Sequence, residues 1–302
     1  MFPILPANSA TAASENDEGI FGYGNTGSLT AITNLVSNAG VVATDTAGVG
    51  TARYFVSACE YGGDKGIFGY GHLGASFVSM TNLVSNTGVV GTDVTGVGTG
   101  RYGSAACSYG EDKGIFGYGI YGGPATAVTN LVSNAGVVAT DTAGVGTARD
   151  NPGACEYGGD KGIFGYGFLT PGYGSMTNLV SNTGVVGTDV TGVGMARHYL
   201  AACGYGGDKG IFGYGSGATT TAVTNLVSDA GVVATDTAGV GTARRNLAAT
   251  QYDGDKGIFG FGRTGAPYVA ITNLVSDAGV VASDQAATTG TARGYLAACS
   301  FN

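Results

Sequence analysis

The sequence predicts an all-β protein built from six copies of one short unit. The phrase D-K-G-I-F-G-Y-G stands at residues 64–71, 112–119, 160–167 and 208–215, with close variants at 17–24 and 255–262. The first glycine of each G-I-F-G falls at positions 19, 66, 114, 162, 210 and 257, so the steps are 47, 48, 48, 48 and 47 residues. A fixed period of this length is the mark of a repeat architecture.

One unit divides into four short runs separated by turn residues. In the second unit these runs are R-Y-F-V-S-A-C-E-Y (53–61), G-I-F-G-Y-G (66–71), M-T-N-L-V-S (80–85) and G-V-V-G-T-D-V (88–94). Each run has the length of a strand, is rich in β-branched or aromatic residues and is bounded by glycine. The connections G-G-D-K and S-N-T-G suit tight turns because Gly and Asn tolerate positive φ. Four antiparallel strands in 48 residues is the pattern of a propeller blade.

The two ends of the repeated region favour a ring over a linear solenoid. The last unit stops at residues 291–302 after a first strand, and the first unit opens at 17–24 with a second strand. We therefore expect the C-terminal strand to pair within the N-terminal blade, which would remove the exposed edges that a solenoid must cap. The prediction is a six-bladed β-propeller of four-stranded antiparallel blades over residues 17–302, preceded by an extended arm over residues 1–16.

The order of motifs in each unit resembles that of kelch repeats. The motifs are A-R-x4-A-C, K-G-I-F-G-Y-G, T-N-L-V-S and G-V-V, and they cover nearly the whole chain after residue 16. The kelch double glycine occurs here only as Gly-Tyr-Gly, and the usual Trp is missing from the chain. In the near-identity of its units, the chain also resembles repeat proteins of tailed bacteriophages and environmental viruses. These resemblances imply a propeller that works by interaction, either as an intracellular adaptor or in a viral particle.

Composition and charge exclude several classes of protein. With 43% hydrophobic residues and 58 glycines, the chain is too apolar for disorder and lacks a collagen triplet. A net charge of −8 argues against nucleic-acid binding, and no apolar run is long enough to cross a membrane. The opening M-F-P-I-L-P-A-N-S-A-T-A-A-S has no recognisable signal-peptide pattern. We favour a virion-associated or extracellular assembly as the location.

Catalytic, cofactor and metal motifs are not found. The two histidines, His72 and His198, occupy non-equivalent places, and no G-x-S-x-G, H-E-x-x-H or C-x-x-C pattern occurs. Five units carry a cysteine in one register, where the sixth has Thr250: Cys59, Cys107, Cys155, Cys203 and Cys299. Packed sheets would keep equivalent cysteines too far apart for disulfides, so we expect buried free thiols. A metal or redox ring is the alternative. The expectation is a non-enzyme without cofactor or metal.

Two charged registers repeat in every unit. The arginines are Arg53, Arg101, Arg149, Arg197, Arg244 and Arg293, and the aspartates are Asp45, Asp93, Asp141, Asp189, Asp236 and Asp284. Each Asp precedes the next Arg by eight or nine residues, which suggests structural ion pairs or hydrogen bonds at the crossover between blades. A ring of arginines that binds an anion at the channel mouth is the alternative.

Comparison of the units with one another predicts a single variable face. The G-G-D-K and S-N-x-G turns stay nearly constant, whereas the residues after the Arg and after G-Y-G change from unit to unit. In an antiparallel blade these variable stretches share one end of the propeller. Candidate binding residues are Tyr54, Phe55, His72, Phe77, Tyr102, Ile120, Tyr121, Phe168, Tyr173, His198, Tyr199, Arg245, Arg263, Tyr268 and Tyr295. Aromatic and Arg side chains on supported loops are typical of recognition surfaces, and neutral drift of unconstrained loops is the alternative.

The predicted function is therefore non-catalytic. We expect a structural, adhesion or protein-interaction propeller whose partners are other proteins or copies of itself. Phe2, Ile4 and Leu5 between the prolines of the arm could dock on a neighbouring copy as an extended segment. The alternative is a lectin-like propeller that binds a cell-surface glycan.

Overall fold

All regular structure in the described part of the chain is β. The computed structural model describes residues 17–285 and 290–301. The strands are β1 (Glu18–Asn25), β2 (Leu29–Val36), β3 (Ser57–Tyr61), β4 (Lys65–Gly69), β5 (Thr81–Val84), β6 (Ala105–Tyr109), β7 (Lys113–Gly117), β8 (Thr129–Val132), β9 (Gly153–Tyr157), β10 (Lys161–Leu169), β11 (Gly172–Val180), β12 (Ala201–Tyr205), β13 (Lys209–Gly213), β14 (Thr224–Val227), β15 (Ala248–Tyr252), β16 (Lys256–Gly260), β17 (Thr272–Val275) and β18 (Ala297–Phe301). Over these ranges the chain forms no helix, and hence none with the length and apolarity to cross a membrane.

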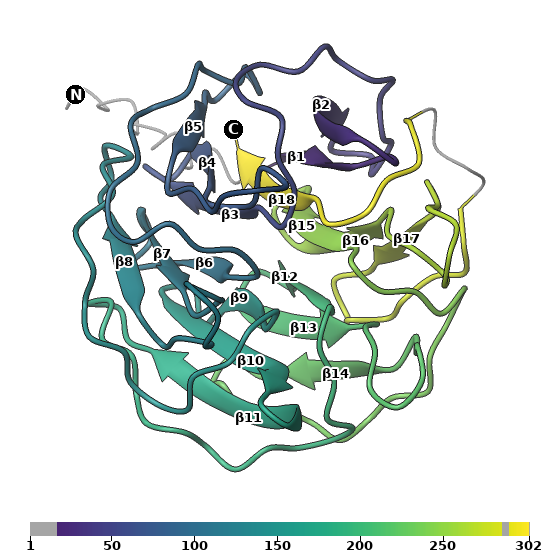
Figure 1. Ribbon diagram of the computed structural model, residues 1–302. Coiled ribbons are helices and arrows are strands. Elements are labelled where there is room, and N and C mark those ends of the chain that lie inside the picture. Colours follow the sequence, from purple (N-terminus) through teal and green to yellow (C-terminus); the bar gives the residue numbers. More distant parts are fainter. Residues whose placement is uncertain (1–16, 286–289, 302) are drawn as a thin grey trace, which may run out of the picture.

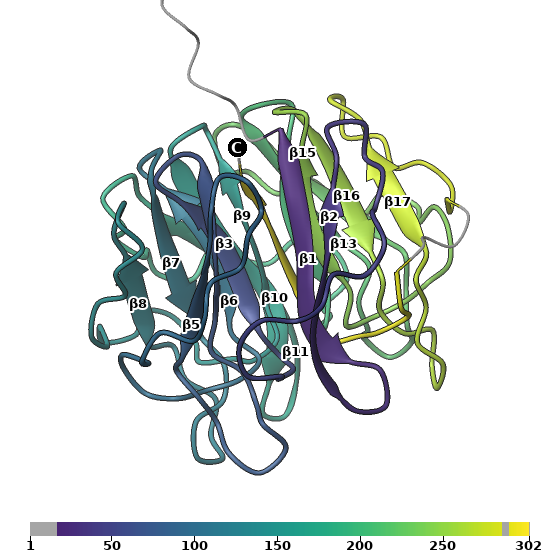
Figure 2. The ribbon, with the colours of Figure 1, turned by 90° about the horizontal axis from the view of Figure 1, so that it is seen from above.

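The strands form six three-stranded antiparallel sheets. Five sheets use consecutive strands, from β3-β4-β5 to β15-β16-β17, and the sixth has the order β18-β1-β2. The sheets are arranged around a common centre, with β3, β6, β9, β12, β15 and β18 innermost (Figure 1). Seen from above, the strands run between two ends of the molecule, where the loops gather (Figure 2). The prediction of an all-β protein with repeated antiparallel sheets is confirmed, and the arrangement is consistent with a β-propeller.

The fourth run of each unit lies beside the third strand without forming a regular strand. In the second unit it makes two isolated bridges, Thr81↔Val94 and Val84↔Val90. Two backbone bonds hold it there, from the Gly91 N–H to the Leu83 carbonyl at 2.8 Å and from the Val94 N–H to the Thr81 carbonyl at 2.8 Å. The other units repeat this pattern, so the structure has three regular strands and one loosely paired segment per unit.

The last strand lies beside the first. β18 pairs antiparallel with β1, in a register that sets Cys299 opposite Ile20 and Phe301 opposite Glu18. A further backbone bond, from the Asn25 N–H to the Gly294 carbonyl at 2.9 Å, extends this contact beyond the strands. The first and last strands of the described residues therefore belong to one sheet.

Glycines in the repeated phrase allow neighbouring sheets to pack closely. A Cβ placed on Gly69 would lie 2.7 Å from Cζ of Phe116 in the next sheet, and one on Gly114 would lie 2.5 Å from Sγ of Cys59. Phe116 is fully buried, so it cannot move aside without opening the core. A Cβ on Gly260 would likewise lie 2.6 Å from Cζ of Phe21, so the β15-β16-β17 sheet packs equally closely on the β18-β1-β2 sheet. The glycines of G-I-F-G thus serve packing between sheets.

Candidate functional site

The cysteines are buried packing residues. All five are free thiols, and each sulfur lies against a glycine of the neighbouring sheet. Burial raises the pKa of every one of them, for example that of Cys203 to about 12. They are therefore protonated at neutral pH, the form that is a poor nucleophile and a poor metal ligand. No group of three His, Cys, Asp or Glu side chains within 17–285 and 290–301 is placed to hold a metal ion.

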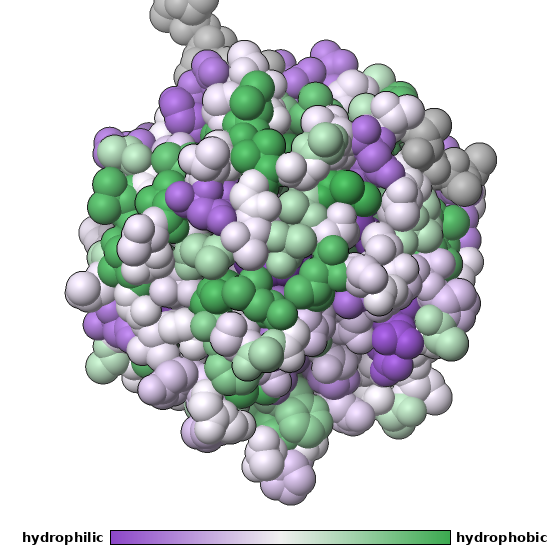
Figure 3. All heavy atoms as spheres, turned by 45° about the horizontal axis from the view of Figure 1, so that its top comes forward, coloured by the Kyte–Doolittle hydropathy of each residue, from purple (hydrophilic) through white to green (hydrophobic). Residues whose placement is uncertain are grey.

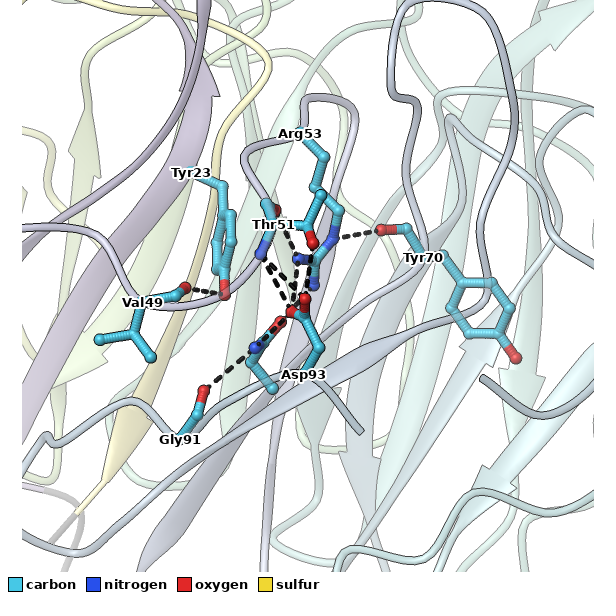
Figure 4. A network of polar contacts seen from close by, with 8 residues as sticks. Tyr23, Val49, Thr51, Arg53, Tyr70, Gly91 and Asp93 are labelled. Carbon is cyan, nitrogen blue, oxygen red and sulfur yellow. Dashed lines mark hydrogen bonds and ion pairs between the residues drawn. The ribbon is translucent and has the colours of Figure 1, made fainter. Parts of the chain in front are cut away.

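Each arginine of the repeated register is fully buried between two sheets. Figure 4 shows Arg53 beside the ring of Tyr23, whose centroid lies 4.3 Å from the guanidinium carbon. Its Nε donates to the Tyr70 carbonyl at 2.9 Å, Nη1 to the Thr51 carbonyl at 3.1 Å and Nη2 to Oδ1 of Asn82 at 2.7 Å. The cation is thus held by carbonyls, an amide and an aromatic face.

The aspartate partner differs from the one that the spacing suggested. Nη1 of Arg53 lies 3.9 Å from Oδ1 of Asp93. Asp93 is in the same unit as Arg53, 40 residues further along the chain. Asp45, eight residues upstream, instead accepts the Thr291 N–H at 3.0 Å. The crossover between units is therefore held by an Asp–Thr contact, since a carboxylate readily caps free backbone N–H groups. The repeated Asn that joins Arg to Asp, Asn82 in this unit, was missed although its T-N-L-V motif never varies.

The six arginines do not form an anion site at a channel mouth. All of them are 0% exposed, with the guanidinium group stacked on a Tyr or Phe ring of the preceding unit. Their role in the structure is to join sheets.

Most of the predicted variable residues come together in one surface, here called the aromatic face. Its members are Tyr54, Phe55, His72, Phe77, Tyr102, Phe168, Tyr173, His198, Tyr199 and Tyr295. The ring centroid of Phe55 lies 4.5 Å from that of Tyr295 and 5.2 Å from that of Tyr102. The His198 ring lies 3.9 Å from Tyr199. Ring contacts therefore link side chains from five units into one cluster.

Two neighbouring positions of each unit build this face. The residue after the Arg forms an isolated β-bridge with the residue after G-Y-G, as in Tyr54↔His72 and Asp150↔Phe168. The next residue has positive φ in every unit, with values from 50° to 63° for Phe55, Gly103, Asn151, Tyr199, Asn246 and Tyr295. The Gly and Asn residues at three of these positions could have revealed this backbone shape in the sequence.

A run of backbone hydrogen bonds connects these positive-φ positions around the centre. The Phe55 N–H donates to the Tyr295 carbonyl at 2.9 Å, and the Tyr295 N–H donates to the Asn246 carbonyl at 2.8 Å. The series continues from Asn246 to Tyr199, from Tyr199 to Asn151 and from Asn151 to Gly103. These bonds fix the backbone that carries the aromatic side chains, so the face is a rigid platform.

The aromatic face contains a hollow of about 440 Å³, here called the aromatic pocket. Its walls include Tyr54, Tyr102, Phe168, His198 and Tyr199. Asp150 also lines it and is only 6% exposed. Sequence reasoning missed Asp150, although it occupies the same register as Tyr54 and Tyr102.

Burial sets the charge of the groups in the pocket. It lowers the pKa of His198 to about 4, with a smaller effect from Arg245, and it lowers the pKa of His72. Burial also raises the pKa of Asp150 to about 6, although a hydrogen bond from Asn151 opposes the rise. At neutral pH the two imidazoles are therefore neutral and Asp150 is mostly ionised.

The remaining predicted residues flank the aromatic face or lie outside the described ranges. Arg263 donates from Nη1 to the Tyr295 hydroxyl at 2.9 Å, and its guanidinium lies 5.5 Å from the Tyr268 ring centre. Ile120 lines the pocket. The backbone of Arg245 forms an isolated antiparallel β-bridge with that of Arg263. Tyr121 is 56% exposed. The proposed docking residues Phe2, Ile4 and Leu5 fall outside the described residues.

A second hollow, of about 570 Å³, includes Glu60 and Glu156 of the innermost strands in its lining. The Ser300 hydroxyl donates to Glu60, and the Ser108 hydroxyl donates to Oε2 of Glu156 at 2.6 Å. Burial raises the pKa of both carboxyl groups, and the charge of Glu60 adds to the rise at Glu156. No sequence motif marked these glutamates, because the same register holds Ser, Gly or Gln in other units.

Comparison with known proteins adds no family. No family model matches the chain, and no curated protein is detectably similar to it. The kelch resemblance therefore depends on the repeated motifs alone.

Proposed function

We propose that this protein is a kelch-like, closed six-bladed β-propeller that acts without catalysis, as a recognition or adhesion module. Its binding surface would be the aromatic face. The observation that supports this most is the convergence of residues that differ between units, such as Tyr54, Tyr102 and Tyr199, into one connected cluster. Aromatic side chains on a rigid backbone provide much contact area at little cost in conformational entropy.

Contacts across the two chain ends support ring closure. The innermost strands follow one another around the centre (Figure 1), and β18 pairs with β1. The hydrogen bond from Phe55 to Tyr295 joins the unit of the β3-β4-β5 sheet to that of the β18-β1-β2 sheet. The close approach of Phe21 to Gly260 joins the β18-β1-β2 sheet to the β15-β16-β17 sheet on its other side. In a closed blade arrangement, each loosely paired fourth segment would be the outer edge of its blade.

Neutral drift explains the aromatic face less well than selection for binding. Residues that drift without constraint have no reason to become a cluster of interlocking rings around a hollow. Phe55, Tyr199 and Tyr295 occupy one register and their rings contact one another, whereas the other three units have Gly or Asn at this register. A partner surface of proteins, or of further copies of this chain, would suit such a face.

Self-association is the form of this function that can be tested without knowing another partner. Apolar side chains occur in separate patches on the face that Figure 3 shows. The exposed apolar side chains of the described residues include valines with exposed fractions of 63–65%. We propose assembly in a virion or another extracellular structure, with the aromatic face as one contact. Sedimentation velocity over a range of concentrations measures such association.

The test compares the wild type with the variant Tyr102→Ala/Tyr121→Ala/Tyr173→Ala. We expect the wild type to associate and the triple variant to sediment as a monomer, because contact area at the face is lost. A matched variant, Val137→Ser/Val185→Ser, removes apolar area elsewhere and should still associate. If the triple variant associates like the wild type, the aromatic face is not the contact.

The second candidate function is glycan binding. The aromatic pocket favours it, because the buried Asp150 carboxylate can accept hydrogen bonds from sugar hydroxyls and aromatic rings line the pocket beside it. The pocket residues are not repeated in every unit, so such a protein would hold one glycan at a time. A glycan array with the wild type and with Asp150→Asn tests this candidate.

A further inference from the structure

The aromatic pocket contains a buried negative charge without a positive partner. Asp150 is 6% exposed, and its Oδ2 accepts a hydrogen bond from Nδ2 of Asn151 at 2.6 Å. Across the described ranges no Lys, Arg or His nitrogen lies within ion-pair distance of this carboxylate. A buried charge is costly unless a partner of opposite sign accompanies it. The arrangement therefore favours a bound cation.

The rings that surround Asp150 are suited to the same kind of ligand. Tyr54, Tyr102, Phe168 and Tyr199 line the pocket with it, and each presents an aromatic ring with a negative face. The imidazoles of His72 and His198 carry no charge at neutral pH, so they do not repel a cation. The charge of Arg245 acts on His198 and Tyr199, but Arg245 does not line the pocket.

We infer that the aromatic pocket binds an alkylated ammonium group, such as that of choline or of a methylated lysine side chain. The inference depends on the proposed function, because it names the ligand class of the same face. Asp150 would neutralise the charge, while the rings of Tyr102, Phe168 and Tyr199 would contact the methyl groups. The hollow of about 440 Å³ exceeds a trimethylammonium head, so the ligand can extend toward solvent.

Other cations fit this pocket less well. A primary ammonium is strongly hydrated and needs several hydrogen-bond acceptors to replace its water, whereas methyl groups remove that need. A divalent metal ion requires a shell of several oxygen ligands, and Asp150 is the pocket's only carboxylate. The combination of one carboxylate with several rings is therefore selective for a cation with an apolar surface.

The test is a calorimetric titration with choline and with its neutral analogue 3,3-dimethylbutan-1-ol, which has the same shape without the charge. We expect choline to bind and the alcohol to bind at least about tenfold more weakly, as expected when a desolvated cation–π contact and an ion pair are lost. Asp150→Asn and Phe168→Ala should each weaken choline binding by about tenfold or more. Val137→Ser, which changes an exposed side chain that does not line the pocket, should leave choline binding unchanged.

The outcomes separate this inference from the proposed function. Equal binding of choline and the alcohol, or no binding of choline at millimolar concentrations, overturns the inference and leaves the self-association test unaffected. Binding of neutral sugars without choline also overturns it, in favour of the glycan alternative. Choline binding by a wild type that does not self-associate would support the inference while contradicting the proposed assembly contact. Circular dichroism of each variant checks that the fold is kept.

Discussion

Replacement of Arg53 by Ala is expected to lower the free energy of unfolding by about 3–5 kcal/mol. Arg53 is fully buried, donates to the Tyr70 and Thr51 carbonyls and to Asn82, and stacks on Tyr23. Alanine leaves these acceptors without a donor in a place that water cannot easily reach, and it also removes the packing of the long side chain.

Denaturant unfolding followed by circular dichroism measures this loss. Lys65→Ala serves as the control, because the side chain of Lys65 is 40% exposed and its ion pair with Asp64 is on the surface. Exposed pairs contribute at most about 1 kcal/mol. A loss for Arg53→Ala no larger than for Lys65→Ala would show that the buried arginine network does not stabilise the sheets.

Deletion of residues 297–302 is expected to abolish cooperative folding at 37 °C. It removes β18, which pairs with β1 over five positions and whose Phe301 is fully buried. The edges of β1 and of the neighbouring inner strands would then lie open, and the loss would exceed about 5 kcal/mol, the lower end of a domain's whole stability. Thermal unfolding of the truncated chain measures the effect.

Addition of a synthetic peptide with the sequence of residues 291–302 provides the control. We expect it to restore a cooperative transition, because it can pair with β1 as β18 does, whereas a scrambled peptide should not. A truncated protein that melts like the full chain would contradict the proposed closure.

The repeated motifs determine most of the fold in a way that sequence reasoning can follow. The 48-residue period, the turns around Gly62 and Gly88 and the runs of β-branched residues correspond to the six observed sheets. The fourth run could not be predicted in detail. Its Val and Thr residues suit a strand, but Asp93 turns its side chain to the Thr51 N–H of the crossover, and the segment keeps only two bridges.

The candidate site could be predicted only in part. Variation between units located the aromatic face, because residues after the Arg and after G-Y-G come to one end of the sheets. The partners in three dimensions depend on packing between units, which spacing along the chain does not encode. For this reason Asp93, and not Asp45, lies beside Arg53. Asp150 was missed because a single carboxylate among variable residues has no periodic mark.

The claim that all else depends on is that the chain closes into a ring through β18. Hydrogen–deuterium exchange of the full-length protein, resolved by peptide, tests it most directly. Closure predicts that the backbone amides of residues 297–301 are as strongly protected as those of β3 and β6, which hold the same place in other sheets. Exchange of 297–301 at the rate of an unstructured peptide, with β3 and β6 still protected, would contradict it.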